Sequence, residues 1–192
     1  MKRILACAAT AALLTGCMSM DRDSAAATGS GARLMAADTA RAPAPMPTNA
    51  VGYMKMAAAS DMFEIESSQL ALQKAGSADI RAFAQMMVDH HTRTSADLMA
   101  AARAGGLTPP SPMLPPDKRA KIEALNGASR GQAFDRMYMD MQVMAHQEAL
   151  ALHSTYAARG DNPSLKAAAA KTAPIVQSHL DRAHALHHGG GA

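Results

Sequence analysis

Side chains that would face a core recur every three or four residues along most of the chain from about Thr48 onward. The clearest case is segment 163–188, whose inward stripe is Leu165, Ala169, Thr172, Val176, His179, Ala183 and Leu186. This alternating four-three spacing places all seven side chains on one side of an α-helix. The pattern therefore predicts an amphipathic helix that buries one face.

Three further segments of similar length show helical periodicity, at about 48–75, 77–104 and 129–158. Gly76 and Ser77 predict a turn between the first two segments. Ser129 and Gln132 have the spacing of a capping box, which predicts the start of the third. Asn162 and Pro163 predict a capped start for the fourth, after a turn at Gly160 and Asp161.

The connection between the second and third long helices differs from the other two. Residues 107–116 contain five prolines, and a short helix is expected at about 117–125. Long amphipathic helices can bury their stripes only against one another. The chain is therefore predicted to be all-α, a four-helix bundle over 48–188 with a Pro-rich crossover and a short extra helix, followed by a flexible tail at 189–192.

The N-terminus has the features of a bacterial export signal. A basic start at Lys2 and Arg3 precedes a short apolar run, which is typical of a signal peptide over residues 1–16. The run ends in Leu14-Thr15-Gly16-Cys17, which resembles the lipobox of bacterial lipoproteins. That resemblance implies that Cys17 is lipidated and anchors the protein in a membrane, and Met18 after it favours the outer membrane, with the protein facing the periplasm.

Residues 17–47 are rich in Ala, Gly, Ser and Pro without sustained periodicity, so a disordered tether is expected there. With Cys7 in the signal and Cys17 lipidated, the mature domain has no thiol for a disulfide or a thiolate metal site.

Composition narrows the functional classes. Aromatic residues make up 3% of the chain and 16 residues are methionine, which favours helices over a β fold. The net charge of +3 falls to +1 without Lys2 and Arg3, so nucleic-acid binding has no electrostatic support.

Four polar residues are predicted to meet at mid-length of the bundle. In an antiparallel pair, residues equidistant from the turn lie side by side. Glu64 and His90 are equidistant from position 77, and His146 and His179 are equidistant from the turn near 162. Glu and His bind Zn, Fe, Cu or Mn in bundle cores, so one Glu and three His predict a mononuclear transition-metal site. The alternative is that these residues form a hydrogen-bonded core network without a metal.

Neighbouring polar residues are expected to support these ligands. Asp89, Tyr138 and Gln142 are the residues expected to orient the ligands, and His91 is expected on a different face from His90. The alternative for Asp89 and His91 is that both are solvated polar residues. Asp61 and Arg93 have the spacing of an ordinary ion pair across the first hairpin.

Methionine and histidine clusters elsewhere in the chain offer alternatives to this site. Met137, Met141 and Met144 share a helical face, and thioethers bind Cu(I), which gives periplasmic copper binding as a further hypothesis; the alternative is core filling. His184, His187 and His188 form a short cluster near the C-terminus. The chain has no Glu-x-x-His pair of the kind used by dinuclear iron oxidases, so an enzymatic role ranks third, after metal binding and after a structural or protein-interaction role in the envelope.

Motifs in all four predicted long helices resemble one family. They are FEIESSQLALQKA at 63–75, FAQMMVDH at 83–90, FDxxY at 134–138, QVxxHQ at 142–147, GDNPxLK at 160–166 and PIVQSHL at 174–180. The family is a bacterial ferritin-like group of predicted outer-membrane proteins, domain of unknown function 4142. The resemblance covers roughly residues 48–187 and implies a ferritin-like bundle in the cell envelope, without an established activity. The doubled His90-His91 is also similar to a His/Met-rich copper-associated family, over that short stretch alone.

Overall fold

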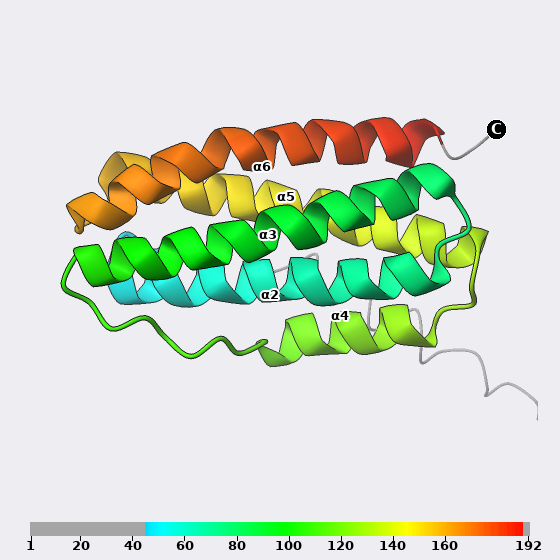
Figure 1. Ribbon diagram of the computed structural model, residues 1–192, viewed down its shortest axis with the longest axis horizontal. Coiled ribbons are helices and arrows are strands. Elements are labelled where there is room, and N and C mark those ends of the chain that lie inside the picture. The colour runs from blue at the N-terminus through cyan, green and yellow to red at the C-terminus, as the bar shows by residue number, and fades with distance from the viewer. Residues whose placement is uncertain (1–44, 190–192) are drawn as a thin grey trace, which may run out of the picture. The chain divides into compact units, whose positions relative to one another are not determined.

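The computed structural model of the chain describes residues 45–189, which form five helices and no strand (Figure 1). The helices are α2 (Ala50–Lys74), α3 (Ala78–Ala104), α4 (Pro116–Gly127), α5 (Gln132–Arg159) and α6 (Pro163–Gly189). An all-helical fold is thus confirmed, with a helix in each predicted segment. None of the described helices combines the length and the apolar composition that crossing a membrane requires. The predicted signal peptide, the lipidated Cys17, nearly all of the tether and the last three residues of the predicted tail lie outside the described residues.

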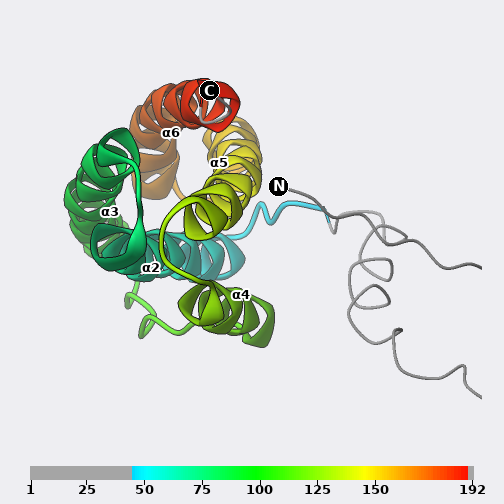
Figure 2. The same cartoon turned by 90° about the vertical axis from the view of Figure 1, so that its right-hand side faces the viewer.

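The four long helices lie lengthwise against one another, and the short helix α4 covers one side (Figures 1 and 2). Tight turns make α2 antiparallel to α3 and α5 antiparallel to α6. The Pro-rich connection and α4 bring the chain back along the outside of α2, so α3 and α5 run in the same direction. In this arrangement α2 contacts α3 and α5, and α6 contacts the same two helices from the other side.

Polar side chains fix the ends of the helices. The Oδ1 and Oδ2 atoms of Asp135 accept hydrogen bonds from the backbone N–H groups of Gly76 and Ser77, both at 2.9 Å, which fastens the α2–α3 turn to α5. Asn162 accepts from the N–H of Leu165 through Oδ1 at 3.2 Å, as predicted for the cap of α6. Its side-chain amide also donates to the Gly105 carbonyl at 3.1 Å, so the same residue ties α6 to the end of α3.

The start of α5 differs from the prediction. The helix begins at Gln132 after Gly131, and no side chain caps it, so the proposed capping box of Ser129 and Gln132 is wrong. Gly131 has φ of 86°, a left-handed conformation that glycine adopts without strain. A Cβ atom at position 76 would lie only 2.9 Å from the Cα atom of Gly131, so the two glycines pack closely. The N–H of Gly131 also donates to the carbonyl of Lys74. Close packing against the α2–α3 turn therefore decides where α5 begins.

The interior has a polar layer between two apolar clusters. One cluster surrounds the stacked rings of Tyr53 and Tyr156, whose centroids are 4.0 Å apart. The other surrounds Phe83, Phe134 and Tyr138 near the opposite end of the bundle. Between them the helices bury polar side chains: Asp61, Glu64, Ser67, Ser68, His91, Gln142, His146, His153 and His179. Burial of the apolar clusters stabilises the bundle. Burial of polar side chains costs free energy unless they are paired, so stability alone does not explain the polar layer.

Candidate metal centre

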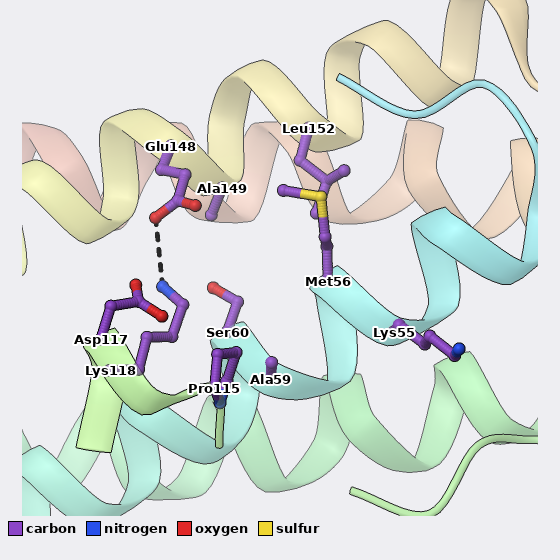
Figure 3. Close-up of a pocket in the computed structure, with 10 residues that line it drawn as sticks. All are labelled: Lys55, Met56, Ala59, Ser60, Pro115, Asp117, Lys118, Glu148, Ala149 and Leu152. Carbon is purple, nitrogen blue, oxygen red and sulfur yellow. Dashed lines mark hydrogen bonds and ion pairs between the residues drawn. The ribbon is translucent and has the colours of Figure 1, made fainter. Parts of the chain in front are cut away.

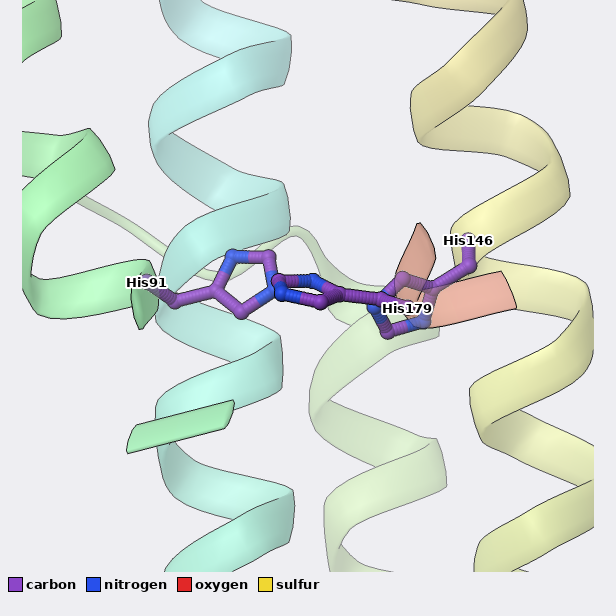
Figure 4. Close-up of side chains that lie close together, drawn as sticks. All are labelled: His91, His146 and His179. Atoms are coloured by element: carbon purple, nitrogen blue, oxygen red, sulfur yellow. The ribbon is translucent and has the colours of Figure 1, made fainter. Parts of the chain in front are cut away.

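Three histidines from three different helices point toward one another in the polar layer (Figure 4). His91 comes from α3, His146 from α5 and His179 from α6. One potential ligand atom of each lies within 4.8 Å of those of the other two, and all three residues are buried. We call His91, His146 and His179 the histidine triad.

The remaining long helix contributes Glu64. Its side chain is 2% exposed, and its Oε1 atom lies 3.7 Å from Nδ1 of His146. Each of the four long helices therefore places one potential metal ligand in the same layer. Imidazole nitrogens and a carboxylate from facing helices are the donors with which bundle proteins bind metal ions.

Asp61 on α2 orients the first ring of the triad. The Nδ1–H group of His91 donates to Oδ1 of Asp61 at 2.8 Å. The Asp61 carboxylate also accepts from the hydroxyls of Thr94 at 2.9 Å and Ser95 at 3.0 Å. These bonds hold the carboxylate in place and leave Nε2 of His91 directed into the layer.

A backbone carbonyl orients the second ring. Nδ1 of His146 lies 2.8 Å from the carbonyl oxygen of Gln142, and because a carbonyl can only accept, this nitrogen carries the hydrogen. Nε2 of His146 then has a lone pair. The Gln142 side chain is itself held, since its amide donates to the Ser67 hydroxyl at 3.2 Å.

A fourth histidine contacts the third ring. Nδ1 of His90 lies 2.8 Å from Nε2 of His179, and the two rings stack with centroids 5.0 Å apart. His90 is half-buried at the α3–α6 contact. Nδ1 of His179 is the nitrogen that remains free inside the bundle.

Six buried side-chain nitrogen and oxygen atoms in residues 45–189 have no hydrogen-bond partner, and all belong to this layer. They are both carboxylate oxygens of Glu64, Nε2 of His91, Nε2 of His146, Nδ1 of His179 and Oε1 of Gln142. An unpartnered buried polar group costs about 1–3 kcal/mol, so a concentration of six needs a physical reason. In each of the three rings, one nitrogen makes a hydrogen bond and the other nitrogen of the same ring has no partner. Histidines that ligate a metal have this arrangement.

Burial and neighbouring charges set the protonation of the triad. Burial lowers the pKa of His179 to about 3, and the charges of His91, His146 and His90 add to that effect. Burial also lowers the pKa of His146, although Glu64 opposes the shift. Burial acts in the same direction on His91, but the hydrogen bond to Asp61 and the charges of Glu64 and Asp61 outweigh it and raise its pKa. Two rings are thus held neutral, as metal ligation requires, and the third would release a proton on binding.

A second hydrogen-bonded pair lies beside the triad. The Nδ1 atom of His153 is 3.0 Å from the hydroxyl of Tyr53, and burial lowers the pKa of His153 to about 4. A cavity of about 10 Å³ lies between His153 and Asp61, which is room for about one water molecule. This pair has a hydrogen-bond partner and contributes none of the unpartnered atoms.

The structure brings Glu64, His146 and His179 together, as predicted from their distances to the turns. It exchanges the roles of the two adjacent histidines, because His91 faces the layer and His90 lies at its edge. The inward residues of α3 are Ile80, Phe83, Ala84, Met87, His91, Leu98 and Ala102. His91 follows Met87 at a spacing of four, so the apolar stripe of α3 indicates that His91 faces inward. Distance from the turn does not distinguish His90 from His91, because a shift of one residue barely changes it.

The residues expected to orient the ligands are only partly the ones that do so. Asp89 is exposed and accepts from the side-chain amide of Gln85 at 2.9 Å, away from every triad ring. Asp61 takes the role that was assigned to Asp89, and the predicted ion pair of Asp61 with Arg93 is wrong. Gln142 holds His146 through its backbone rather than its side chain. Tyr138 is buried one layer away, where its hydroxyl bonds to that of Ser68 at 2.8 Å.

The methionines predicted as an alternative copper site are divided between the core and the surface. Met137 and Met141 pack against the apolar clusters, while Met144 is 52% exposed. The exposed histidines near the C-terminus also lie apart from the triad, and His187 pairs with Asp140 at 2.6 Å. Among the described residues, the triad is the cluster with metal-binding geometry.

An open cavity of about 250 Å³ lies on the outer side of the bundle between α2, α4 and α5 (Figure 3). Met56, Ala59 and Leu152 form part of its apolar wall, and the ion pair of Lys118 and Glu148, at 3.1 Å, stands at its polar end. No triad histidine lines this cavity. The triad is therefore separate from this surface feature.

The sequence profile of one family, described as Domain of unknown function (DUF4142), matches residues 35–186. The chain belongs to the DUF4142 family. This match covers the five helices except the last three residues of α6, includes every residue of the triad, and confirms the domain of unknown function 4142 that the sequence motifs indicate. No curated protein matches this DUF4142 chain.

A solved structure with a similar fold is that of CopM in the Cu(II)-bound form. The two align with a TM-score of 0.61 and 16% sequence identity, over 74% of this chain and 98% of the CopM chain. At this identity the likeness shows that the two proteins share an all-helical fold.

Proposed function

We propose that this DUF4142 protein binds one divalent transition-metal ion in the centre of its helical bundle. His91, His146 and His179 are the proposed ligands, and Glu64 is the fourth. The observation that carries the proposal is the set of unpartnered buried atoms, because one metal ion between the three rings would satisfy three nitrogens at once. Glu64 is proposed as the fourth ligand because its unpartnered carboxylate is buried beside His146.

The charges of the layer favour a divalent ion. Glu64 and Asp61 are buried carboxylates, and the imidazoles beside them add no charge once His91 has released its proton to bind the ion. A divalent ion would neutralise the two carboxylates, whereas Cu(I) would leave one buried negative charge uncompensated. Imidazole and carboxylate ligands suit Zn(II), Fe(II) and Cu(II), and the likeness to CopM makes Cu(II) the first ion to test.

The number of ligands indicates storage, transport or a structural role for the ion rather than catalysis. Four protein ligands close a tetrahedral site, whereas catalytic sites keep a position open for water or substrate. The competing hypothesis, a structural or protein-interaction module with a metal-free hydrogen-bonded core, requires that the polar layer satisfy itself. Six unpartnered atoms disfavour that hypothesis.

We also propose a ferritin-like architecture and an envelope location. Ferritin-like bundles have one long crossover between two helix hairpins, and the Pro-rich segment with α4 has that place in this chain. The basic and apolar start followed by Leu14-Thr15-Gly16-Cys17 supports a lipoprotein anchored in the outer membrane and facing the periplasm. Metabolic labelling with a radioactive fatty acid should mark the wild type and leave Cys17→Ser unlabelled. Equal labelling of both would contradict the anchor.

Metal binding is tested by elemental analysis of the full chain, extracted in detergent and carrying no His tag. After incubation with Cu(II), Zn(II) or Fe(II) and desalting, the wild type should retain one equivalent of at least one ion. The variant His91→Ala/His179→Ala should retain none. The matched control His187→Ala/His188→Ala, which removes two exposed histidines, should bind as the wild type does. Equal retention by the triad variant and the wild type would overturn the proposal.

A further inference from the structure

His90 contacts the histidine triad but is not one of the proposed metal ligands, so its role has to be explained separately. Its Nδ1 atom lies 2.8 Å from Nε2 of His179, and the rings stack at an interplanar angle of 29°. Two neutral imidazoles at this distance share one hydrogen between the facing nitrogens. Which ring carries that hydrogen decides what the other side of His179 can do.

Two arrangements satisfy the contact, and they have opposite consequences. If Nε2–H of His179 donates to Nδ1 of His90, then Nδ1 of His179 has a lone pair that faces the interior. If Nδ1–H of His90 donates instead, Nδ1 of His179 carries a hydrogen. That hydrogen would be a buried donor without a partner, because this atom has none among the described residues.

The other two triad rings do not have this ambiguity. His91 donates to a carboxylate and His146 to a backbone carbonyl, and both of these groups can only accept. His179 is the triad member whose partner, another imidazole, can either donate or accept. The hydrogen on His179 therefore depends on His90.

We propose that His90 is a positioning residue: it accepts a hydrogen bond from Nε2–H of His179 and thereby turns the lone pair of Nδ1 toward the metal. This inference rests on the proposed function for its effect on metal affinity, but its statement about the hydrogen on His179 holds for the metal-free protein as well. It also specifies that His179 would coordinate through Nδ1, whereas His91 and His146 would use Nε2.

The first test uses the metal-free protein and nitrogen-15 NMR of the imidazole side chains at pH 7.5. In the wild type, His179 should show hydrogen on Nε2 and none on Nδ1. His90→Ala should convert this single form into a mixture. His90→Gln, whose side-chain oxygen can accept from Nε2–H, should restore it. Finding the hydrogen of His179 on Nδ1 in the wild type would overturn the inference.

The second test measures Cu(II) and Zn(II) affinity by competition with a chelator. Loss of a residue that orients a metal ligand costs about 10–100-fold in affinity, so His90→Ala should weaken binding by that factor and His90→Gln should recover most of it. His184→Ala, a control for a partly buried histidine on α6, should bind as the wild type does. Equal affinity of His90→Ala and the wild type would also overturn the inference.

X-ray absorption separates positioning from ligation. The bound ion should have three imidazole ligands both in the wild type and in His90→Ala. Four in the wild type and three in the variant would show that His90 is itself a ligand and would contradict the proposed role. If the wild type binds no metal, the proposed function fails, while the NMR result still decides whether His90 fixes the hydrogen on His179.

Discussion

Nδ1 of His91 lies 2.8 Å from Oδ1 of Asp61, and the imidazole and the carboxylate are both buried in the middle of the bundle. Carboxylate–imidazole pairs of this kind fix the ring of a metal ligand and make its free nitrogen more basic. Two hydroxyls from α3 complete the bonds to Asp61, so the carboxylate is held by the same helix that presents His91. This charge-assisted orienting interaction therefore joins α2 to α3.

Asp61→Asn tests that interaction. The substitution keeps the shape of the side chain but removes its charge. It also turns one of the two acceptor oxygens into a donor, either the one that accepts from Ser95 or the one that accepts from His91 and Thr94. Metal affinity should fall about 10–100-fold. Metal-free stability should fall by about 1–3 kcal/mol, because hydroxyl donors lose their acceptor. Competition titration and urea unfolding measure the two effects, with Asp89→Asn, an exposed carboxylate on α3, as the control. A similar loss of affinity in both variants would contradict the role of Asp61.

Glu64→Met should separate function from stability. In the metal-free protein both Glu64 oxygens are buried without partners, so an apolar side chain of similar volume should stabilise the fold by about 1–3 kcal/mol. The same variant should lose tight metal binding, because the fourth ligand and its charge are gone. Urea unfolding and metal titration measure both, and Glu66→Met, on a more exposed face of α2, should change stability by less than about 0.5 kcal/mol. A Glu64→Met variant that is less stable without metal would show that Glu64 has a structural partner.

Acid should weaken the metal-free protein. Histidines whose pKa is depressed in the folded state favour that state above their unfolded pKa, near 6.5, and destabilise it as pH falls below that value. With folded values of about 4 for His153 and about 3 for His179, each should lower the free energy of unfolding by about 2 kcal/mol between pH 6.5 and 5. His91, whose pKa is raised, is protonated in both states over this range and adds nothing there, but it lowers stability as pH rises above 6.5.

Melting curves of the metal-free chain between pH 5 and 8 measure this dependence. The melting temperature should be highest just above pH 6.5 and fall by several degrees toward pH 5. Bound metal should delay the acid loss until protons displace it. A melting temperature that stays flat from pH 7 to pH 5 would mean that these histidines are solvated in the folded protein.

Most of the fold could be read from the sequence because helix period and turn residues are local signals. Gly76, Ser77 and Asn162 lie at helix ends in the structure as they do in the pattern. The start of α5 could not be predicted from local signals, because the approach of Gly131 to Gly76 is a tertiary contact between segments far apart in the sequence.

The site was predictable in its location and less so in its members. Distances from the turns place Glu64, His146 and His179 in one layer, because helical rise is regular. Choosing between His90 and His91 needs the rotation of α3 about its axis, which its apolar stripe sets and distance from the turn does not. Asp61 precedes Glu64 by three residues, so helical spacing places both on the same face of α2. The prediction of an ordinary ion pair with Arg93 rested on distance from the turn and left that spacing unused.

A crystal structure of the Cu(II)-loaded chain, with anomalous scattering recorded on both sides of the copper absorption edge, tests the central claim most directly. We predict a single strong peak between His91, His146 and His179, with Glu64 completing the ligands and Nδ1 of His179 facing the ion. A peak confined to the C-terminal histidines His184, His187 and His188, with none in the polar layer, would contradict a buried metal centre.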